Sequence, residues 1–255
     1  MIPIKSETQI EKMRAAGDLA SCVLNAVAEL IAPGVTTGEL DQAGGRLIAE
    51  AGAKSAFLGY NGTFPAHLCI SVNDEVVHGI GGKRKINYGD IVKLDCGVVL
   101  NGWIGDTAAT IPVGIIEPNV ERLLRVTEEA LLGAVALATD GRRLGDISHY
   151  IEQQVVLNGF SVVREFVGHG VGSRLHEEPQ IPNFGRKGTG PKLKAGMTLA
   201  IEPMVNLGRE QVRVLADKWT VVTKDGSPSA HFEHTVLVTK DQPEVLTWRR
   251  KSLLN

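Results

Sequence analysis

The spacing of apolar and polar residues predicts that the chain opens with two helices. Residues 6–9 have the pattern of a capping box, in which a serine and a glutamine satisfy the free amides of a first helical turn. Apolar residues then recur with a helical period to about residue 31, and Pro33–Gly34 ends the helix. Residues 36–39 repeat the capping pattern, and the second helix is expected to end near Gly52.

Strands are predicted after these helices. Residues 69–80 and 90–100 are rich in β-branched and apolar side chains. Asn101–Gly102 separates the second run from another apolar run, and this dipeptide is typical of a two-residue β-hairpin turn. Such a turn pairs Leu100 with Trp103. The chain is therefore expected to change from helices to antiparallel strands.

The predicted hairpin brings two aspartates together. Counting back from the turn places Asp95 opposite Ala108, and Asp106 precedes Ala108 by two residues. Because side chains alternate along a strand, Asp95 and Asp106 share one face as diagonal neighbours, roughly 7 Å apart at the backbone. Two carboxylates within apolar strands need a cation or a basic partner, unless one of them takes a proton. The alternative is that one or both face solvent at a sheet edge.

The same order of elements is predicted a second time. Asn119 is expected to cap a third helix that runs to about Ala138, and a glycine-rich turn leads into a fourth helix that ends near Gly159. The two halves align at one constant offset. Three pairs of segments lie 107 positions apart, namely Gly34 with Gly141, residues 38–40 with 145–147, and Gly52 with Gly159.

This repeat indicates an internal duplication and a fold class. Two helix-helix-strand halves related by a pseudo-twofold axis give an α+β domain, with a shared antiparallel sheet covered on one face by helices. A cleft between the halves is then the expected place for a site.

Composition restricts the classes of function. A chain of 255 residues can bury one core, so a single domain over residues 1–255 is expected. The 27 basic and 29 acidic residues form no long run of either sign, which argues against a nucleic-acid partner. The three cysteines show no CxxC spacing, so neither a disulfide framework nor a zinc ribbon is expected. A cytoplasmic monomer without an export signal or membrane span fits these features.

Further histidine and carboxylate side chains recur in apolar segments downstream. His169 lies between glycines, Glu202 precedes a proline, and Glu233 precedes His234. Each one alone has an ordinary explanation, since a single histidine is more often a structural residue and a Glu before Pro more often a turn. Together with Asp95 and Asp106 they supply oxygen and nitrogen donors suited to two divalent ions that share carboxylates. No cysteine belongs to the set, which disfavours structural zinc.

Over nearly its whole length, to residue 238, the chain resembles the type I, bacterial-like methionine aminopeptidases of peptidase family M24. The resemblance rests on an aspartate, a second aspartate eleven residues on, a histidine between glycines, a Glu-Pro and a Glu-His-Thr. It implies the pita-bread (creatinase/aminopeptidase) fold, with duplicated halves around a central antiparallel sheet. It also implies a metalloaminopeptidase that removes the N-terminal methionine of nascent proteins and peptides, preferably when the second residue is small.

The resemblance assigns the metal ligands residue by residue. It implies that Asp106 and Glu233 bridge two divalent ions, that Asp95 completes one of them, and that His169 and Glu202 complete the other. The resemblance also implies that hydroxide from this dinuclear centre attacks the carbonyl of the first residue. Cobalt, manganese, iron and zinc all suit such donors, and availability decides among them.

The resemblance also implies catalytic and substrate-binding residues. Glu202 is the expected proton carrier, His176 is expected to steady the oxyanion, and His78 to hydrogen-bond the amide nitrogen of the leaving chain. Both histidines are substrate-binding residues on this interpretation. The ordinary alternative is that His78 and His176 are polar residues of the cleft without a chemical role.

The methionine pocket is the least determined part of the resemblance. It is expected to be lined by aromatic and sulfur-containing side chains at Tyr60, Phe64, Cys69 and Trp219. Such groups contact a thioether favourably, although they suit an ordinary core equally well. Three positions depart from the family pattern, with leucine at 175 in place of an aromatic residue, histidine at 231 in place of glutamine, and isoleucine at 104 in place of histidine.

Two other functions fit parts of the same pattern. An X-Pro dipeptidase of this fold shares the ligand set, but such relatives carry an additional N-terminal domain that the few residues before the first helix cannot form. A non-catalytic binding module of this fold has usually lost ligands, whereas all five are present here.

The partners expected from the resemblance are peptides with N-terminal methionine and nascent chains near the ribosome. No specific nucleic acid and no membrane are expected.

Overall fold

The helices of the computed structural model, which describes residues 1–248, fall into the two predicted pairs. The part of the single-domain prediction that concerns residues 249–255 lies outside the described residues. The helices are α1 (Glu7–Ala28), α2 (Thr37–Glu50), α3 (Pro118–Val135) and α4 (Leu144–Leu157). No helix among the described residues combines the length and apolar character needed to cross a bilayer.

Two predicted helix boundaries are corrected by the structure. The first helix ends at Ala28, before residue 31, because the chain turns there instead of continuing its helical hydrogen bonds. The third helix begins at Pro118 and is capped by Glu117, so the predicted cap at Asn119 is wrong. Proline is favoured at a first helical position because its fixed φ suits the helix and its missing N–H has no partner there.

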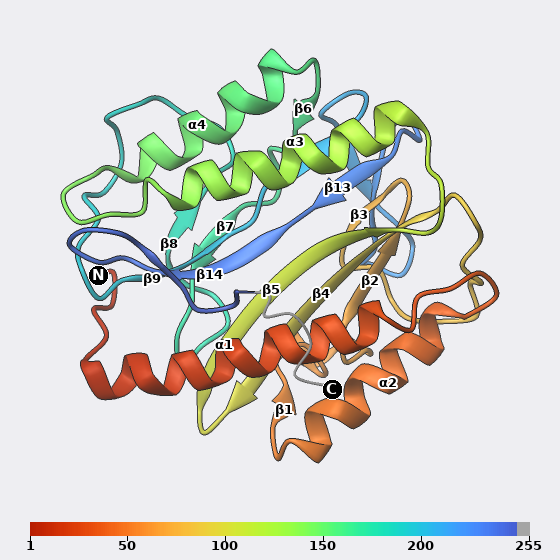
Figure 1. The fold of residues 1–255 in the computed structure, drawn as a ribbon, viewed down its shortest axis with the longest axis horizontal. Helices are drawn as coiled ribbons and strands as arrows, with labels where there is room; N and C mark the ends of the chain where they lie inside the picture. Colours follow the sequence, from red (N-terminus) through yellow and green to blue (C-terminus); the bar gives the residue numbers. More distant parts are fainter. Residues whose placement is uncertain (249–255) are drawn as a thin grey trace.

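The strands form one large sheet and two small ones (Figure 1). In the nine-stranded sheet the order is β1-β4-β5-β14-β9-β7-β8, with β2 also paired to β4 and β15 to β14. The small sheets have the orders β13-β10-β6 and β11-β12-β3. The strands are β1 (Lys54–Ser55), β2 (Cys69–Val72), β3 (Glu75–Val77), β4 (Ile91–Leu100), β5 (Trp103–Pro112), β6 (Ser161–Val162), β7 (Gly168–Gly170), β8 (Glu177–Ile181), β9 (Thr198–Ile201), β10 (Met204–Asn206), β11 (Val212–Val214), β12 (Val221–Thr223), β13 (Ser229–His231), β14 (Glu233–Leu237) and β15 (Glu244–Val245).

The hairpin between β4 and β5 has the predicted register. Leu100 pairs with Trp103 and Asp95 with Ala108. The turn residues Asn101 and Gly102 have φ values of 51° and 79°. Two positive φ values in sequence are the requirement of the turn that matches the twist of a hairpin, and asparagine and glycine adopt them at low cost. The register therefore follows from the turn residues alone, as the sequence predicted.

The internal duplication is also confirmed by the bounds and contacts of the elements. Thr37 and Leu144 begin α2 and α4, and Glu50 and Leu157 end them, so both ends are 107 residues apart. The bridge from Thr36 to Lys85 recurs, at the same offset, as the bridge from Arg143 to Lys192. In the sheet, β5 and β14 are neighbours at the junction of the two halves.

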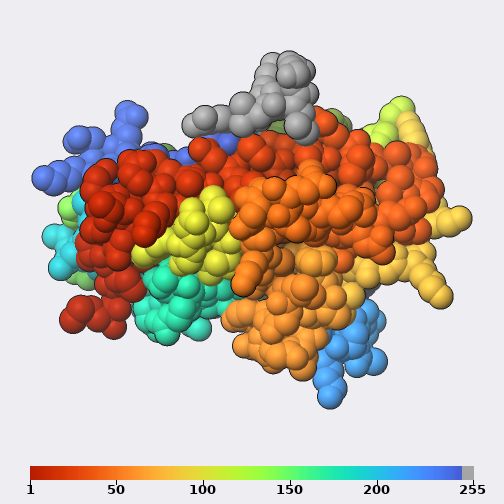
Figure 2. Space-filling view, turned by 90° about the horizontal axis from the view of Figure 1, so that it is seen from below, coloured from red at the N-terminus to blue at the C-terminus, as the bar shows by residue number. Residues whose placement is uncertain are grey.

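The helices pack against one face of the sheet and leave the other face for the site. A side chain at Gly105 of β5 would collide with the backbone of Ala16 and Gly17 in α1. Because side chains alternate along a strand, the neighbouring Asp106 points to the opposite face. Figure 2 shows α1 and α2, in red and orange, forming a continuous layer on their side of the molecule.

A buried ion pair fixes the N-terminal segment beside the sheet. Lys5 Nζ lies 2.7 Å from Glu177 Oε2, and each side chain is 4% exposed. The Lys5 amide also donates to Gly196 O at 2.8 Å. Glu177 begins β8, so this contact ties residues before α1 to the far edge of the sheet.

Lys5→Met is expected to lower the free energy of unfolding by about 3 kcal/mol, because it leaves the Glu177 carboxylate buried without its partner. Urea unfolding of the metal-free protein measures this change. The exposed Lys12 gives a matched control, since Lys12→Met should change the free energy by less than about 0.5 kcal/mol. Equal stabilities of the two variants would show that the ion pair contributes nothing.

Candidate metal centre

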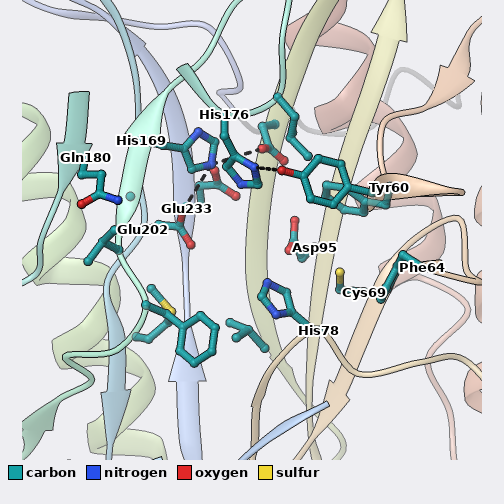
Figure 3. A pocket seen from close by; sticks show the side chains of 18 of the residues that line it. Tyr60, Phe64, Cys69, His78, Asp95, His169, His176, Gln180, Glu202 and Glu233 are labelled. Carbon is teal, nitrogen blue, oxygen red and sulfur yellow. Dashed lines mark hydrogen bonds and ion pairs between the residues drawn. The ribbon is translucent and has the colours of Figure 1, made fainter. Parts of the chain in front are cut away.

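Four neighbouring strands and the residue that directly follows a fifth, β9, bring the five predicted ligands to a common site (Figure 3). Asp95 of β4 and Glu233 of β14 lie on one line across the sheet, since both pair with Ala108 of β5. Asp106 lies two residues before Ala108 on the same face. A small residue at 108 leaves space between the two flanking carboxylates.

The remaining two ligands reach the same face from the other half of the sheet. Ala200 of β9 pairs with both Thr235 of β14 and His169 of β7. Glu202 follows Ala200 by two residues, so it shares the face of His169. The structure thus brings together all five predicted ligands, and for three of them, His169, Glu202 and Glu233, no local pattern predicted that they lie side by side.

The hydrogen bonds of His169 orient one ring nitrogen towards the carboxylates. Its Nδ1 lies 2.9 Å from Gly170 O, and a carbonyl oxygen can only accept, so Nδ1 carries the proton. The lone pair is then on Nε2, which lies 3.4 Å from Glu202 Oε1 and 3.8 Å from Asp106 Oδ2. A hydrogen bond from the other ring nitrogen to a carbonyl oxygen is the usual way in which a protein prepares an imidazole to bind a metal.

Burial raises the pKa of every carboxyl group in this cluster. It raises the pKa of Asp106 to about 7. The pKa values of Asp95, Glu202 and Glu233 lie well above the ordinary range, through burial first and then through repulsion between the acidic neighbours. The pKa of His169 falls to about 3, because burial and the nearby His176 both disfavour its charged form. The cluster therefore carries an electrostatic cost that a cation would remove.

The donor set fits a divalent metal. Three of its oxygens, Asp95 Oδ1, Asp106 Oδ1 and Glu233 Oε1, are buried and have no hydrogen-bond partner within residues 1–248. Single ligand atoms of Asp106, His169 and Glu233 all lie within 4.8 Å of one another. Buried carboxylate oxygens without donors are costly in an apolar environment, and coordination satisfies them.

The two predicted catalytic histidines lie on opposite sides of this cluster. His78 follows β3 with a φ of 59°, an unusual conformation for a residue other than glycine. Its ring contacts Phe166 and Trp219 edge to face, with centroids 5.4 and 6.3 Å apart. Burial lowers the pKa of His78 to about 4, and His176 contributes to this shift. His78 is therefore neutral at pH 7, with one ring N–H available as a donor.

The predicted methionine pocket adjoins the carboxylates. Phe64 packs edge to face on Trp219, with ring centroids 5.1 Å apart. Cys69 of β2 pairs with Asp95 of β4 and lies beside that carboxylate. Tyr60, in a short 3-10 turn, contacts His176. The four residues predicted for the pocket thus line one cavity of about 640 Å³, which also contains the five carboxylate and histidine donors.

Other residues of this cavity were not predicted from the sequence. Phe57, Val77, Phe166 and Met204 add apolar lining. None of them carries a distinctive local signal, since an isolated apolar residue in a loop or strand is ordinary. Only for Phe57 did the hairpin hold a clue. Gly97 of β4 leaves a space without a side chain, and the ring of Phe57 occupies it.

The three departures from the family pattern lie around the site without removing a ligand. Leu175 and Ile104 are both buried in the apolar cluster that contains Phe64 and Cys69. His231 is 1% exposed, and its Nε2 lies 3.4 Å from Glu202 Oε2. The first two therefore affect packing beside the pocket, and the third contacts a predicted ligand directly.

With this geometry established, comparison with known proteins decides the family. The family model described as "Metallopeptidase family M24" matches residues 11–240. The chain belongs to this family. The recognition made from the motifs is thereby confirmed, and divalent metal use follows from it.

Individual relatives cover the chain almost completely. "Methionine aminopeptidase" of Clostridium perfringens is 52% identical over 97% of this chain and 99% of its own length. The crystal structure of methionine aminopeptidase from Thermotoga maritima is 48% identical, covers 97% of this chain and 99% of its own, and superposes with a TM-score of 0.95. The pita-bread fold predicted from the sequence is confirmed.

A more distant structure shares the fold alone. The prolidase from Pyrococcus horikoshii is 24% identical, with a TM-score of 0.78. It aligns with 98% of this chain but with only 65% of its own length. The match supports the architecture described above and carries no argument about the reaction.

Proposed function

We propose that this protein is a metal-dependent aminopeptidase that removes the N-terminal methionine of peptides and proteins. The observation that carries the proposal is the cluster of five donors that neighbouring strands of the sheet bring together, at the base of an apolar pocket with aromatic and sulfur-containing walls. Relatives named methionine aminopeptidase, which cover nearly the whole chain, support the same function.

We propose that the five donors hold two divalent ions. Asp106 and Glu233, on the neighbouring strands β5 and β14, would each hold both ions. Asp95 would complete one coordination sphere, and His169 with Glu202 the other. When bound, such ions polarise the carbonyl of the first residue and lower the pKa of a bound water, so that a nucleophile forms near neutral pH. Manganese, iron, cobalt and zinc all suit these donors.

The protein's own groups then have separate tasks. Glu202, which lines the same cavity as His78 and His176, would carry the proton that moves from the attacking water to the leaving amine. His176 would donate a hydrogen bond to the oxygen that becomes negative in the transition state. His78, neutral at pH 7, would hydrogen-bond the backbone of the leaving chain.

Specificity for methionine follows from the wall of the cavity. Tyr60, Phe64 and Trp219 offer aromatic contacts to a thioether, and Cys69 a further sulfur. Cys69 stays a thiol, because burial and then the charge of Asp95 raise the pKa of its side chain well above the ordinary range. A small second residue is expected to be preferred, since in the proposed mechanism the next side chain would lie close to His78 and His176.

Release of methionine from a Met-Ala-Ser peptide tests the proposal. The protein is stripped of metal with a chelator and resupplied with manganese or iron, and a Met-Pro peptide is run in parallel. We expect metal-dependent release from Met-Ala-Ser. Binding of metal without release from any peptide would point instead to a binding module, and cleavage of other residues before proline would point to a dipeptidase.

The setting of the reaction is also a proposal. We propose that the substrates are nascent chains met near the ribosome and that the protein acts in the cytoplasm as a monomer. The substrate class supports this setting, because new chains are the main source of N-terminal methionine. No specific nucleic acid and no membrane are expected as partners.

A further inference from the structure

The hydroxyl of Tyr60 contacts Nδ1 of His176. A role for Tyr60 as part of the pocket wall does not account for this contact. Figure 3 shows the two side chains joined by this hydrogen bond. Their rings meet edge to face, with centroids 5.2 Å apart. The contact joins the loop after β1 to the segment before β8, which are 116 residues apart in the sequence.

We propose that Tyr60 is a positioning residue, whose hydroxyl donates to His176 Nδ1 and thereby holds the imidazole with its proton on Nε2, facing the substrate. The proposal rests on the proposed function, because it concerns the group that would stabilise the transition state. It assigns Tyr60 a role beyond contact with the methionine side chain.

The chemistry of the two side chains gives the direction of the bond. A neutral imidazole has one N–H and one lone pair, and the phenol can donate or accept. Burial raises the pKa of Tyr60 above its ordinary value, so the phenol keeps its proton at neutral pH. If Tyr60 donates to Nδ1, the single proton of His176 lies on Nε2. The opposite tautomer would leave a lone pair facing the substrate oxygen, and two lone pairs repel.

The backbone around each partner is fixed independently. Tyr60 N donates to Phe57 O at 2.7 Å, and Phe64 N donates to Tyr60 O at 3.1 Å. On the other side, Glu177 follows His176 directly and is held by the buried ion pair with Lys5. The Tyr60 hydroxyl is therefore needed for the orientation and tautomer of the His176 ring, and not for the path of the chain.

This arrangement connects recognition with chemistry. The segment from Phe57 to Phe64 supplies aromatic pocket walls and also the hydroxyl that orients His176. A side chain that fills the pocket and packs on this segment would hold Tyr60 against the histidine. Peptides whose first residue fills the pocket poorly should then lose kcat as well as affinity.

Tyr60→Phe tests the proposal, because it removes the hydroxyl and keeps the ring. We expect kcat for Met-Ala-Ser to fall by about ten- to a hundredfold, which is no more than the fall in kcat when a direct oxyanion donor is removed. KM should change by less than about threefold. In the His176→Ala background, Tyr60→Phe should cause no further loss. The exposed Tyr88 supplies the matched control, and Tyr88→Phe should leave kcat and KM unchanged.

The tautomer of His176 provides a readout that does not depend on activity. Zinc is diamagnetic, so ¹⁵N spectra of the zinc-loaded protein can separate protonated from unprotonated ring nitrogens. We expect the wild-type protein to show the proton on Nε2 and Tyr60→Phe to show a mixture of tautomers. A proton on Nδ1 in the wild type would overturn the proposal, as would a rise in KM with unchanged kcat.

The two proposals can fail separately. A wild-type protein that releases methionine from no peptide would remove the proposed function, whereas the spectra would still report the His176 tautomer. An active protein in which Tyr60→Phe keeps both the tautomer and kcat would remove only the role of Tyr60.

Discussion

Asp106→Asn is expected to lower kcat/KM for Met-Ala-Ser by more than about a hundredfold. Loss of a residue that only orients a metal ligand already costs about 10- to 100-fold, and Asp106 is proposed to be a direct ligand. Asparagine has nearly the same shape but no charge, so it cannot bridge two cations. The measurement is steady-state kinetics at saturating manganese, together with calorimetric titration of the metal.

The stability of the same variant shows whether the fold is intact. In a chelator, Asp106→Asn should unfold at the same temperature as the wild type or at a higher one. The reason is that it removes one of the carboxyl groups that repel each other in the buried cluster. Added metal should then raise the unfolding temperature of the wild type more than that of the variant. Asp241→Asn, at an exposed carboxylate, is the matched control for activity and stability. Wild-type kcat/KM in Asp106→Asn would refute its place in the metal centre.

Metal affinity is expected to fall by at least about tenfold between pH 8 and pH 6. Asp106, with a pKa of about 7, is mostly ionised at pH 8 and mostly protonated at pH 6. When the pH is below the pKa of a ligand group, the metal must displace a proton from it. Metal affinity then falls about tenfold for each such proton and each pH unit. Asp95, Glu202 and Glu233 have raised pKa values and add to this slope. His169 adds nothing, because its pKa of about 3 leaves it neutral throughout.

Calorimetric titration with zinc in two buffers of different ionisation enthalpy measures both the affinity and the protons released. Proton release should be larger at pH 6 than at pH 8, and Asp106→Asn should release fewer protons at pH 6 than the wild type. Circular dichroism at each pH excludes unfolding as the cause. An affinity that is the same at pH 6 and pH 8 would mean that the carboxyl groups are already ionised in the metal-free protein.

The expected effects of Asp106→Asn and of pH arise from one property of the centre. Several acidic groups lie close together where water has little access. The sheet holds these groups in place because their strands are fixed by backbone hydrogen bonds and by the helices behind them. Loss of metal therefore leaves repulsion between these acidic groups, and the folded protein cannot relieve it by moving them apart. The cost appears as raised pKa values and as a metal-dependent stability.

The sequence by itself determined the features that depend on neighbouring residues. The turn residues Asn101–Gly102 set the register of β4 and β5, and this register placed Asp95 and Asp106 on one face. Capping side chains located the start of α2, and the constant offset of 107 residues revealed two similar halves. In each case the deciding interaction lies within one turn of helix or one hairpin, so the order of residues is sufficient.

Only the tertiary structure decided which distant segments meet. Glu233 joins the aspartates because β14 pairs with β5, and His169 joins Glu202 because β7 pairs with β9. Neither pairing has a local signal, and motif resemblance supplied those residues without their geometry. The contact between Tyr60 and His176 is of the same kind. Such contacts depend on how separate strands and loops pack around a shared core, and that packing is a property of the whole chain.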